Sequence, residues 1–364
     1  MKSVFSLIII VFISLLTFGQ HEPKSTPTIG KAKNIILLIG DGMGTSQIYA
    51  GMTAKEEPLN IEQFKVAGFS KTYSASNYIT DSGAGGTAIA TGYKTYNKAI
   101  GVDKDTISRK SILEYADEKG KATGLVATSQ VTHATPASFI AHQKQRYMYE
   151  EIAEDFFKTD IDVFIGGGLD HFTKRKDSVD LTIKLREEKY QVVYHTDEFS
   201  RIKEGKLAGL LYDNAPPRYS EGRGEMLVKS TSKAIELLSQ NENGFFLMVE
   251  GSQIDWGAHD NNTEYVVEEM IDFDNAVGIA LEFAKQHGNT LVIVTADHET
   301  GGMGLNEGSL LTHEVKAGFT SGNHTSVMVP VFAYGPGSEN FGGIQENTDL
   351  FFKMMNAFGF ILDN

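Results

Sequence analysis

The amino-acid sequence contains no cysteine among its 364 residues. This absence excludes a disulfide framework, an iron–sulfur cluster, a zinc site built on thiolates and a cysteine nucleophile. Positive charge is also scarce, because 33 lysines and arginines face 47 aspartates and glutamates, and the formal net charge is −14. Proteins that bind nucleic acids or anionic lipids use clustered positive charge. We therefore expect no nucleic-acid-specific binding and no anchoring on an anionic membrane.

Long hydrophobic runs are absent after residue 20. Lys2 is the only charged residue before position 21, and an apolar run from Val4 to Leu16 follows it. A short positive start, an apolar stretch and a polar end are typical of a secretory signal peptide, whereas a membrane-spanning helix needs ~20 apolar residues. The sequence therefore predicts a signal peptide at residues 1–20, cleaved near Gly19 or Gln20. We expect a periplasmic or secreted protein with no stable membrane anchor.

Short apolar runs alternate with helical segments along the rest of the chain. The strand-like runs are 34–39, 124–127, 161–165, 245–249, 290–295 and 327–334, and the helix-period segments include 111–118, 149–157, 226–238 and 263–286. This alternation predicts an α/β fold in which helices cover both faces of a central, largely parallel sheet. No repeat or linker divides residues 21–364, so we expect a single domain. The glycine-rich segment 299–323 is interpreted as a short insertion loop between two strands.

Polar residues with metal-binding chemistry follow several of the predicted strands. In open α/β sheets, ligands bind beyond the carboxyl ends of the strands. The residues found there are Asp41, the segment 132–135, Glu250, Asp297 and His298. Each of them alone could belong to an ordinary turn or be a structural histidine. Together they predict a ligand site at the carboxyl edge of the sheet.

A second group of histidines and carboxylates extends this set. Asp255 and His259 are four residues apart, which places both side chains on one face of a helix. His324 lies just before another apolar strand. Imidazole and carboxylate ligands suit Zn²⁺, and ligand sets made only of oxygen suit Mg²⁺. Because the sequence contains both imidazole ligands and oxygen ligands in sufficient number, it predicts more than one metal ion.

Ser82 lies at the start of a stretch of small residues, Gly83–Ala88, that is expected to be helical. A hydroxyl group at a helix N-terminus lies beside unpaired N–H groups and the positive end of the helix dipole, which favour an arriving anion. Alternatively, Ser82 or Asp81 only caps the helix. Capping explains one of these two residues but not the small surface that follows. A nearby metal ion would lower the pKa of the Ser82 hydroxyl and activate it without a histidine base.

Six motifs occur in a fixed order along the chain. They are Asp41–Gly44, Thr80–Ser82, His133–Ala137, Val249–Gly251, Thr295–His298 and His324–Thr325. Together they resemble the bacterial alkaline phosphatase family, and the resemblance extends from about residue 33 to residue 336. It implies a three-layer α/β sandwich with short surface insertions. It also implies hydrolysis of small-molecule phosphate monoesters through a phosphoserine intermediate.

The resemblance implies a role for each motif residue. Ser82 would be the nucleophile. The first Zn²⁺ would be held by Asp255, His259 and His324, the second Zn²⁺ by Asp41, Asp297 and His298, and one Mg²⁺ by Asp41, Thr135 and Glu250. Two neighbouring metal ions stabilise both the entering and the leaving oxygen of an in-line displacement, which gives this set a physical purpose.

Three further residues complete the predicted site. Arg146 lies where the family carries its phosphate-binding arginine, and its planar guanidinium can bind two phosphate oxygens at once. The alternative for Arg146 is an ordinary surface charge on a helix. His133 and Trp256 stand where some family members carry an aspartate and a lysine, and this pair resembles another bacterial subgroup. Both are expected beside the metals, where Trp256 either packs on the pocket wall or hydrogen-bonds a phosphate-bound water.

Three other functions compete with this interpretation. A sulfatase of the same superfold would need a C/S-x-P-x-R sequence, which Ser82-Gly83-Ala84 does not fit. A phosphodiesterase of the superfold usually has a threonine nucleophile and lacks the third metal site. A non-catalytic exported phosphate- or metal-binding protein would retain the ligands without requiring Ser82. The resemblance favours the phosphatase, and it implies a homodimer whose interface is small because residues 299–323 form a short segment.

Overall fold

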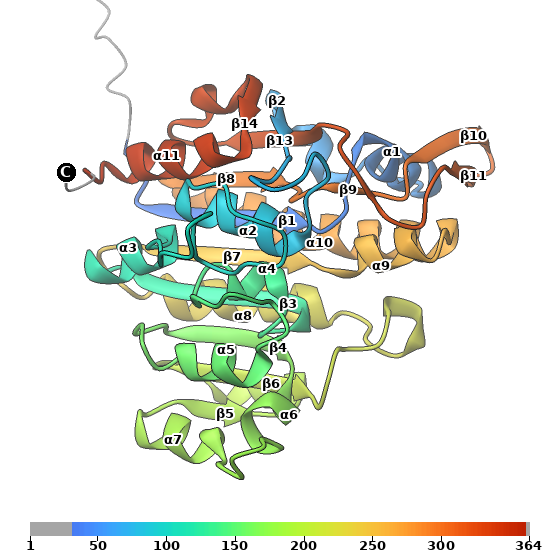
Figure 1. The fold of residues 1–364 in the computed structure, drawn as a ribbon. Helices are drawn as coiled ribbons and strands as arrows, with labels where there is room; N and C mark the ends of the chain where they lie inside the picture. Colours follow the sequence, from blue (N-terminus) through green and yellow to red (C-terminus); the bar gives the residue numbers. More distant parts are fainter. Residues whose placement is uncertain (1–30, 362–364) are drawn as a thin grey trace, which may run out of the picture.

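The computed structural model describes residues 31–361, so the predicted signal peptide at 1–20 lies outside the described residues. In the described part, ten strands form one sheet in the order β14-β2-β13-β8-β1-β7-β3-β4-β6-β5 (Figure 1). Their bounds are β1 Asn34–Gly40, β2 Val66–Lys71, β3 Ala122–Gln130, β4 Val163–Gly167, β5 Gln191–Val193, β6 Leu207–Tyr212, β7 Phe245–Gly251, β8 Thr290–Thr295, β13 Val329–Tyr334 and β14 Gly343–Glu346. Neighbouring strands are parallel except where β13 meets β8 and β2.

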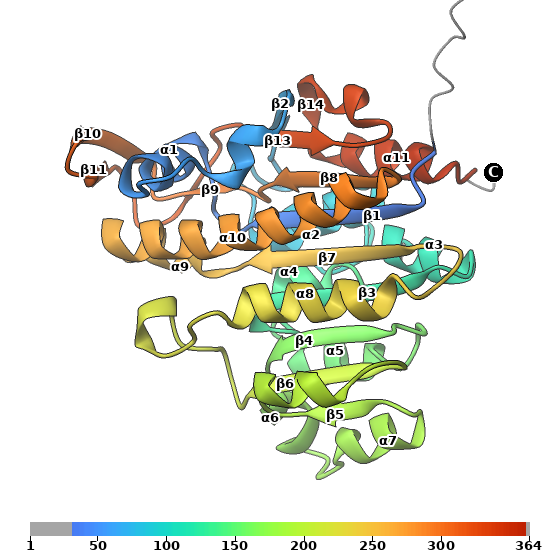
Figure 2. The ribbon, with the colours of Figure 1, turned by 180° about the vertical axis from the view of Figure 1, so that it is seen from behind.

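Helices cover both faces of this sheet. The face seen in Figure 1 carries α2 Ser82–Thr91, α3 Ile112–Glu118, α4 Ala134–Ala137, α5 Tyr149–Asp155, α6 Leu169–Thr173, α7 Leu181–Glu187 and α11 Asn347–Phe358. The opposite face, seen in Figure 2, carries α1 Thr45–Ala54, α8 Met226–Leu238, α9 Gln253–His259 and α10 Thr263–His287. Short 3-10 helices lie at Asn60–Gln63, Thr196–Arg201, Tyr219–Glu221 and Ser338–Phe341. The predicted α/β class and largely parallel sheet are confirmed.

The central strand β1 shows why the apolar runs form strands. All seven of its residues are buried. Ile35, Leu37 and Ile39 pack into the hydrophobic cluster that includes residues of α2, α3 and α11. Ile36 and Leu38 pack into the other cluster, which includes residues of α8 and α10. A strand covered on both faces needs apolar residues at successive positions, which gives a continuous apolar run instead of an alternating pattern.

The sheet order brings the predicted ligands together. Strands β8, β1, β7 and β3 are neighbours in the middle of the sheet and run parallel. Their carboxyl ends therefore open on the same edge, and the chain after each strand carries a candidate ligand. The carboxyl ends of these four strands lie near α9 and α4, in the middle of the sheet between its outer strands β14 and β5 (Figures 1 and 2).

Residues 299–323 lie between β8 and β13, where the sequence predicts an insertion loop, but they contain short strands and are not an irregular loop. They contain β9 Glu299–Thr300 and the hairpin β10 Met303–Ser309 with β11 Glu314–Phe319. Strand β9 pairs with β12, His324–Thr325. Gly301 and Gly302 have φ values of 86° and 55°, a conformation that glycine adopts readily and that directs the chain from β9 into the hairpin. In β11 the apolar residues Val315, Ala317 and Phe319 alternate with Glu314, Lys316 and Gly318, and these three apolar side chains are partly buried against the hydrophobic cluster.

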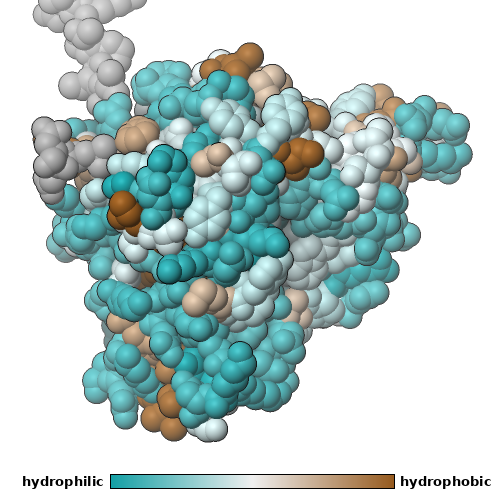
Figure 3. Space-filling view, viewed as in Figure 1, coloured by the Kyte–Doolittle hydropathy of each residue, from teal (hydrophilic) through white to brown (hydrophobic). Residues whose placement is uncertain are grey.

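The surface of the described chain is predominantly polar. Figure 3 shows hydrophilic residues over most of one face, with small separate hydrophobic areas. Among residues 31–361, none of the helices combines the length and the apolar character needed to cross a bilayer.

Candidate active site

Ser82 is the first residue of α2, and its side chain is buried. The preceding residue, Asp81, caps the helix, because its carboxylate accepts a hydrogen bond from the Ala84 N–H at 3.1 Å. Ser82 is therefore not used for capping. Its Oγ atom lies 3.2 Å from Nε2 of His298 and 3.4 Å from Nη1 of Arg146. The hydroxyl group thus lies between an imidazole and a guanidinium, two of the predicted site residues.

The small residues of α2 allow a close approach to the rest of the site. A Cβ atom at Gly85 would lie 2.9 Å from the carbonyl oxygen of Asp297, closer than side chains tolerate. A Cβ atom at Gly83 would lie 2.9 Å from the carbonyl oxygen of Ala99. The glycines therefore let the start of the helix pack directly against the turn that carries Asp297.

Asp255, His259 and His324 form the first ligand cluster. Nε2 of His259 lies 3.1 Å from Nε2 of His324, and these atoms lie 3.3 Å and 3.6 Å from Oδ1 of Asp255. Each histidine uses Nδ1 to donate to a backbone carbonyl, Gly322 O at 2.8 Å and Thr80 O at 2.9 Å. Both Nε2 atoms are therefore directed at each other and at a carboxylate.

This arrangement suits a cation. The hydrogen bond that His259 donates to the Asp255 carboxylate raises the pKa of His259 to about 9, so the three groups favour a proton or a metal ion among them. The three ligand atoms lie within 4.8 Å of one another, which suits one ion. Two imidazoles and one carboxylate, with Nδ1–H groups held by carbonyls, are typical of protein zinc sites.

Asp41, Asp297 and His298 form the second cluster, and all three side chains are fully buried. Nε2 of His298 lies 3.4 Å from Oδ1 of Asp41 and 3.3 Å from Oδ2 of Asp297. Burial, followed by repulsion from Asp255 and Glu250, raises the pKa of Asp297 to about 8. Burial and the nearby charge of Asp297 raise the pKa of Asp41 well above its ordinary value. A divalent cation would remove this repulsion, so the donor set fits a second metal ion.

Asp41 also belongs to a third cluster, with Glu250 and His133. Thr135 donates to Oδ2 of Asp41 at 3.4 Å, and burial raises the pKa of Glu250 to about 7. Among the described residues, two buried carboxylate oxygens have no hydrogen-bond partner: Oε1 of Glu250 in this third cluster, and Oδ1 of Asp41, which faces His298 of the second cluster. Unpaired buried carboxylate oxygens beside a hydroxyl group suit a hard cation such as Mg²⁺. The two oxygens of Asp41 thus face two different clusters.

Arg146 connects the nucleophile region with His133. Its Nη1 donates to Oδ2 of Asp81 at 3.0 Å, and its Nη2 lies 3.1 Å from Nε2 of His133. Burial and the positive charge of Arg146 lower the pKa of His133 to about 3, so this imidazole is neutral. Because Arg146 can only donate, Nε2 of His133 accepts and its Nδ1 carries the proton. That N–H group is buried and lacks a partner in the part of the chain that the structure describes.

The structure thus brings every predicted site residue to one edge of the sheet. Trp256 lies on α9, between Asp255 and His259 in the sequence, and it is half-buried. Its ring is edge-on to the ring of His133, with 6.1 Å between the two ring centroids. Sequence reasoning missed Thr300, which is fully buried and hydrogen-bonds both Asp255 and His298. Its only sequence signal is its place two residues after the Asp297-His298 pair.

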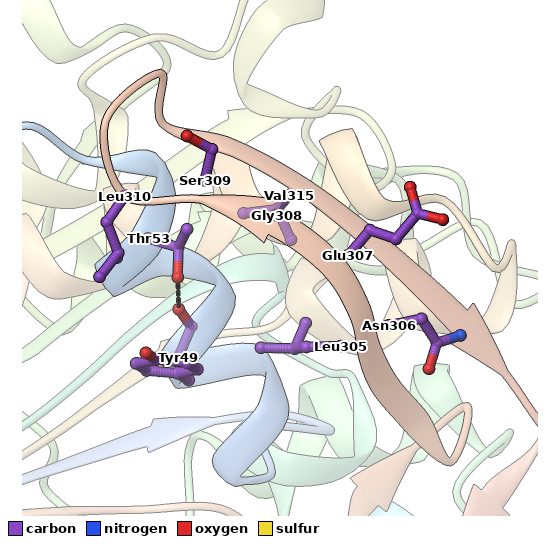
Figure 4. A pocket seen from close by; sticks show the side chains of 9 residues that line it. All are labelled: Tyr49, Thr53, Leu305, Asn306, Glu307, Gly308, Ser309, Leu310 and Val315. Carbon is purple, nitrogen blue, oxygen red and sulfur yellow. Dashed lines mark hydrogen bonds between the residues drawn. The ribbon is translucent and has the colours of Figure 1, made fainter.

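A separate cavity of about 260 Å³ lies between α1 and the β10–β11 hairpin (Figure 4). Tyr49 and Thr53 of α1 line one side, and Leu305 and Val315 of the hairpin line the other. None of the predicted site residues lines this cavity.

Comparison with known proteins identifies the family. The alkaline phosphatase family model matches residues 32–315 and 304–360. Alkaline phosphatase 4 of Bacillus subtilis (strain 168) is 37% identical, over 98% of this chain and 98% of the relative. The solved alkaline phosphatase of the Antarctic bacterium TAB5 is 46% identical, with a TM-score of 0.87 over 92% of this chain and 99% of that one. A histidine-to-aspartate mutant of the TAB5 enzyme is described with Mg bound in its M3 site.

These matches cover nearly the whole described chain and agree with its fold. They confirm the resemblance found in the sequence and the prediction of a phosphatase enzyme. The chain belongs to the alkaline phosphatase family.

Proposed function

We propose that this chain hydrolyses phosphate monoesters through a covalent phosphoserine at Ser82. The observation that carries the proposal is the position of Ser82 Oγ, 3.2 Å from His298 Nε2 and 3.4 Å from Arg146 Nη1. Arg146 would bind two non-bridging phosphate oxygens, and Asp81 would keep its guanidinium directed at the phosphate. The Ser82 oxygen would lose its proton and form a bond to phosphorus as the bond from phosphorus to the alcohol oxygen breaks, and the leaving oxygen would take up a proton to give the alcohol. Water would then cleave the phosphoserine and release inorganic phosphate.

The three clusters support two zinc sites and one magnesium site. Asp255, His259 and His324 would hold the first Zn²⁺, Asp41, Asp297 and His298 the second, and Asp41, Thr135 and Glu250 the Mg²⁺. When bound, these ions supply Lewis-acid chemistry, because they lower the pKa of a hydroxyl group or water and offset phosphoryl charge. The protein supplies the fixed positions of the ligands and of the Ser82 and Arg146 side chains.

Substrate class provides the direct test of this function. We expect rapid phosphate release from a chromogenic monoester at pH 7 to 10, and much slower turnover of a matched diester and a matched sulfate ester. The physical reason is charge. A diester has a second oxygen esterified and carries less negative charge than a monoester, so part of the positive charge of Arg146 and of the metal ions would remain unpaired. Faster diester or sulfate turnover would replace the proposal with another hydrolase of the superfold. Binding of phosphate without turnover of any of the three esters would indicate a binding protein.

The departure at His133 gives a second prediction. His133→Asp should bind Mg²⁺ at least ~10-fold more tightly at the third cluster, because it adds a negative charge beside Asp41 and Glu250. A Mg²⁺ titration of metal-free protein, followed by calorimetry, measures this affinity. His195→Asp is the matched control, since His195 precedes the 3-10 helix at Thr196–Arg201 and is outside the ligand clusters. Equal Mg²⁺ affinities for His133→Asp and the wild-type protein would refute the role of His133.

The remaining features of the proposal concern the whole protein. We propose export to the periplasm or the medium, supported by the signal-peptide pattern of residues 1–20. We propose a homodimer, supported by resemblance to the family. A single catalytic domain over residues 21–364 is supported by the sheet, because β1, near the start of the described chain, and β14, near its end, belong to the same ten-stranded sheet.

A further inference from the structure

Thr300 lies between the first and second ligand clusters. It ends the two-residue strand β9, and its direct partner across the ladder with β12 is His324. Its backbone N–H donates to Gly42 O at 3.2 Å, and its carbonyl accepts from Gln47 Nε2 at 2.8 Å. The backbone of Thr300 is thus held from two sides by the segment that follows β1. The backbone that carries the hydroxyl group is therefore fixed by contacts other than those to Asp255 and His298.

The hydroxyl group contacts one residue of each cluster. Oγ1 of Thr300 donates to Oδ1 of Asp255 at 2.5 Å and lies 3.2 Å from Nδ1 of His298. A hydroxyl group has a single proton, and an ionised carboxylate can only accept. The Thr300 proton therefore points to Asp255, and Nδ1 of His298 must donate its own proton to Oγ1. This leaves the lone pair of His298 on Nε2, the atom that faces Asp41, Asp297 and Ser82.

His259 and His324 of the first cluster are held in the same tautomer by backbone carbonyls. His298 differs, because the group that holds it is a side chain that also orients a residue of the neighbouring cluster. We propose that Thr300 is a positioning residue shared by the two predicted zinc sites, in which one hydroxyl group fixes the tautomer of His298 and the orientation of Asp255. This inference rests on the proposed two-zinc site and assigns a residue that acts on both halves of it.

Zinc binding to metal-free protein tests the role without relying on activity. Thr300→Val keeps the shape and the backbone contacts but removes the hydroxyl group. We expect it to bind Zn²⁺ roughly 10-fold to 100-fold more weakly in calorimetric titration, with both binding steps affected, as is usual when the partner of a metal ligand is lost. Thr300→Ser keeps the hydroxyl group and should restore both affinities to within about 3-fold of the wild-type values. Thr300→Val with wild-type affinity at both steps would overturn the proposal.

Two further variants separate positioning from packing. Thr182 in α7 is a matched control, since its buried hydroxyl group also donates to an aspartate, Asp180, at 2.7 Å. Thr182→Val should leave both zinc affinities unchanged. If Thr300→Val does not fold, Thr300→Ala replaces it, and the proposal still requires the serine variant to bind zinc more tightly than the alanine variant. Equal weakening in the serine and alanine variants would mean that the methyl group acts through packing, and would also overturn the proposal.

The outcome for the wild-type protein distinguishes this inference from the function on which it rests. A wild-type protein that binds no Zn²⁺ and releases no phosphate refutes the proposed function. A wild-type protein that does both, alongside a valine variant that binds Zn²⁺ equally well, refutes only the role of Thr300.

Discussion

Ser82→Ala is expected to lower kcat for a phosphate monoester by at least ~10²-fold, because the covalent step needs an oxygen nucleophile at the start of α2. The substitution removes one buried oxygen and leaves the helix cap at Asp81 in place. Folding and phosphate binding through Arg146 should therefore persist. Steady-state kinetics measures the loss, and a rapid-mixing experiment measures the burst of alcohol release that accompanies phosphoserine formation.

The matched control for this variant is Ser230→Ala in α8. Ser230 is fully buried, and its hydroxyl group has no hydrogen-bond partner among residues 31–361. Loss of that oxygen should leave kcat unchanged. A full burst in the Ser82→Ala variant would exclude a covalent intermediate on this serine. Equal losses in both variants would indicate a general effect of removing buried hydroxyl groups.

Removal of metal ions is expected to abolish activity and to lower Tm by at least ~5 °C, while Zn²⁺ and Mg²⁺ together should restore both. The reason is the concentration of buried negative charge, since Asp41, Glu250 and Asp297 all have raised pKa values. Cations that bind only the folded protein offset this repulsion. Exhaustive chelation followed by kinetics and thermal unfolding measures both effects, and undiminished turnover after chelation would refute the metal assignment.

The pH dependence of the metal-free protein gives a further check on the same clusters. Glu250, Asp297 and His259 have folded-state pKa values of about 7, 8 and 9, each above its ordinary value. A group with a raised pKa binds more protons in the folded than in the unfolded state, so stability falls as pH rises towards its folded pKa. We therefore expect the metal-free protein to lose stability progressively between about pH 4 and pH 9, with Asp297 and Glu250 contributing from their ordinary pKa values of 3.8 and 4.5 upwards and His259 from 6.5. The metal-loaded protein should not, and Asp297→Asn should make the metal-free loss smaller.

The sequence predicted the middle of the sheet more accurately than its edges. The runs at 34–39, 245–249 and 290–295 agree with β1, β7 and β8 to within two residues, because strands buried on both faces leave a continuous apolar run. Strand β2 was not predicted, since its exposed and buried residues are mixed and it is stabilised by pairing with β13 and β14, both distant in sequence. Pairing between strands that are distant in sequence is not visible in the pattern of neighbouring residues, so a short stretch of sequence does not predict it.

The candidate site residues that the sequence predicted are of residue types that are uncommon directly after apolar strands. Histidines and carboxylates after apolar strands stand out against an ordinary background, and these are the residues that form the clusters. Thr300 does not stand out, because threonine is common in strands and its role depends on two hydrogen bonds to distant residues. The sequence does not distinguish Asp81 from Ser82 as the cap of α2, because both residue types cap helices, and the structure shows that Asp81 accepts the hydrogen bond from the Ala84 N–H group.

The ligand clusters draw on residues from position 41 to position 324, and they meet only where four central strands lie side by side. Closing such long loops costs conformational entropy before any contact between the ligands can form. The complete set of ligands therefore exists only once most of the chain has folded. Metal ions would therefore bind this set only after the main folding barrier has been crossed. We expect them to slow unfolding and to leave the folding rate nearly unchanged.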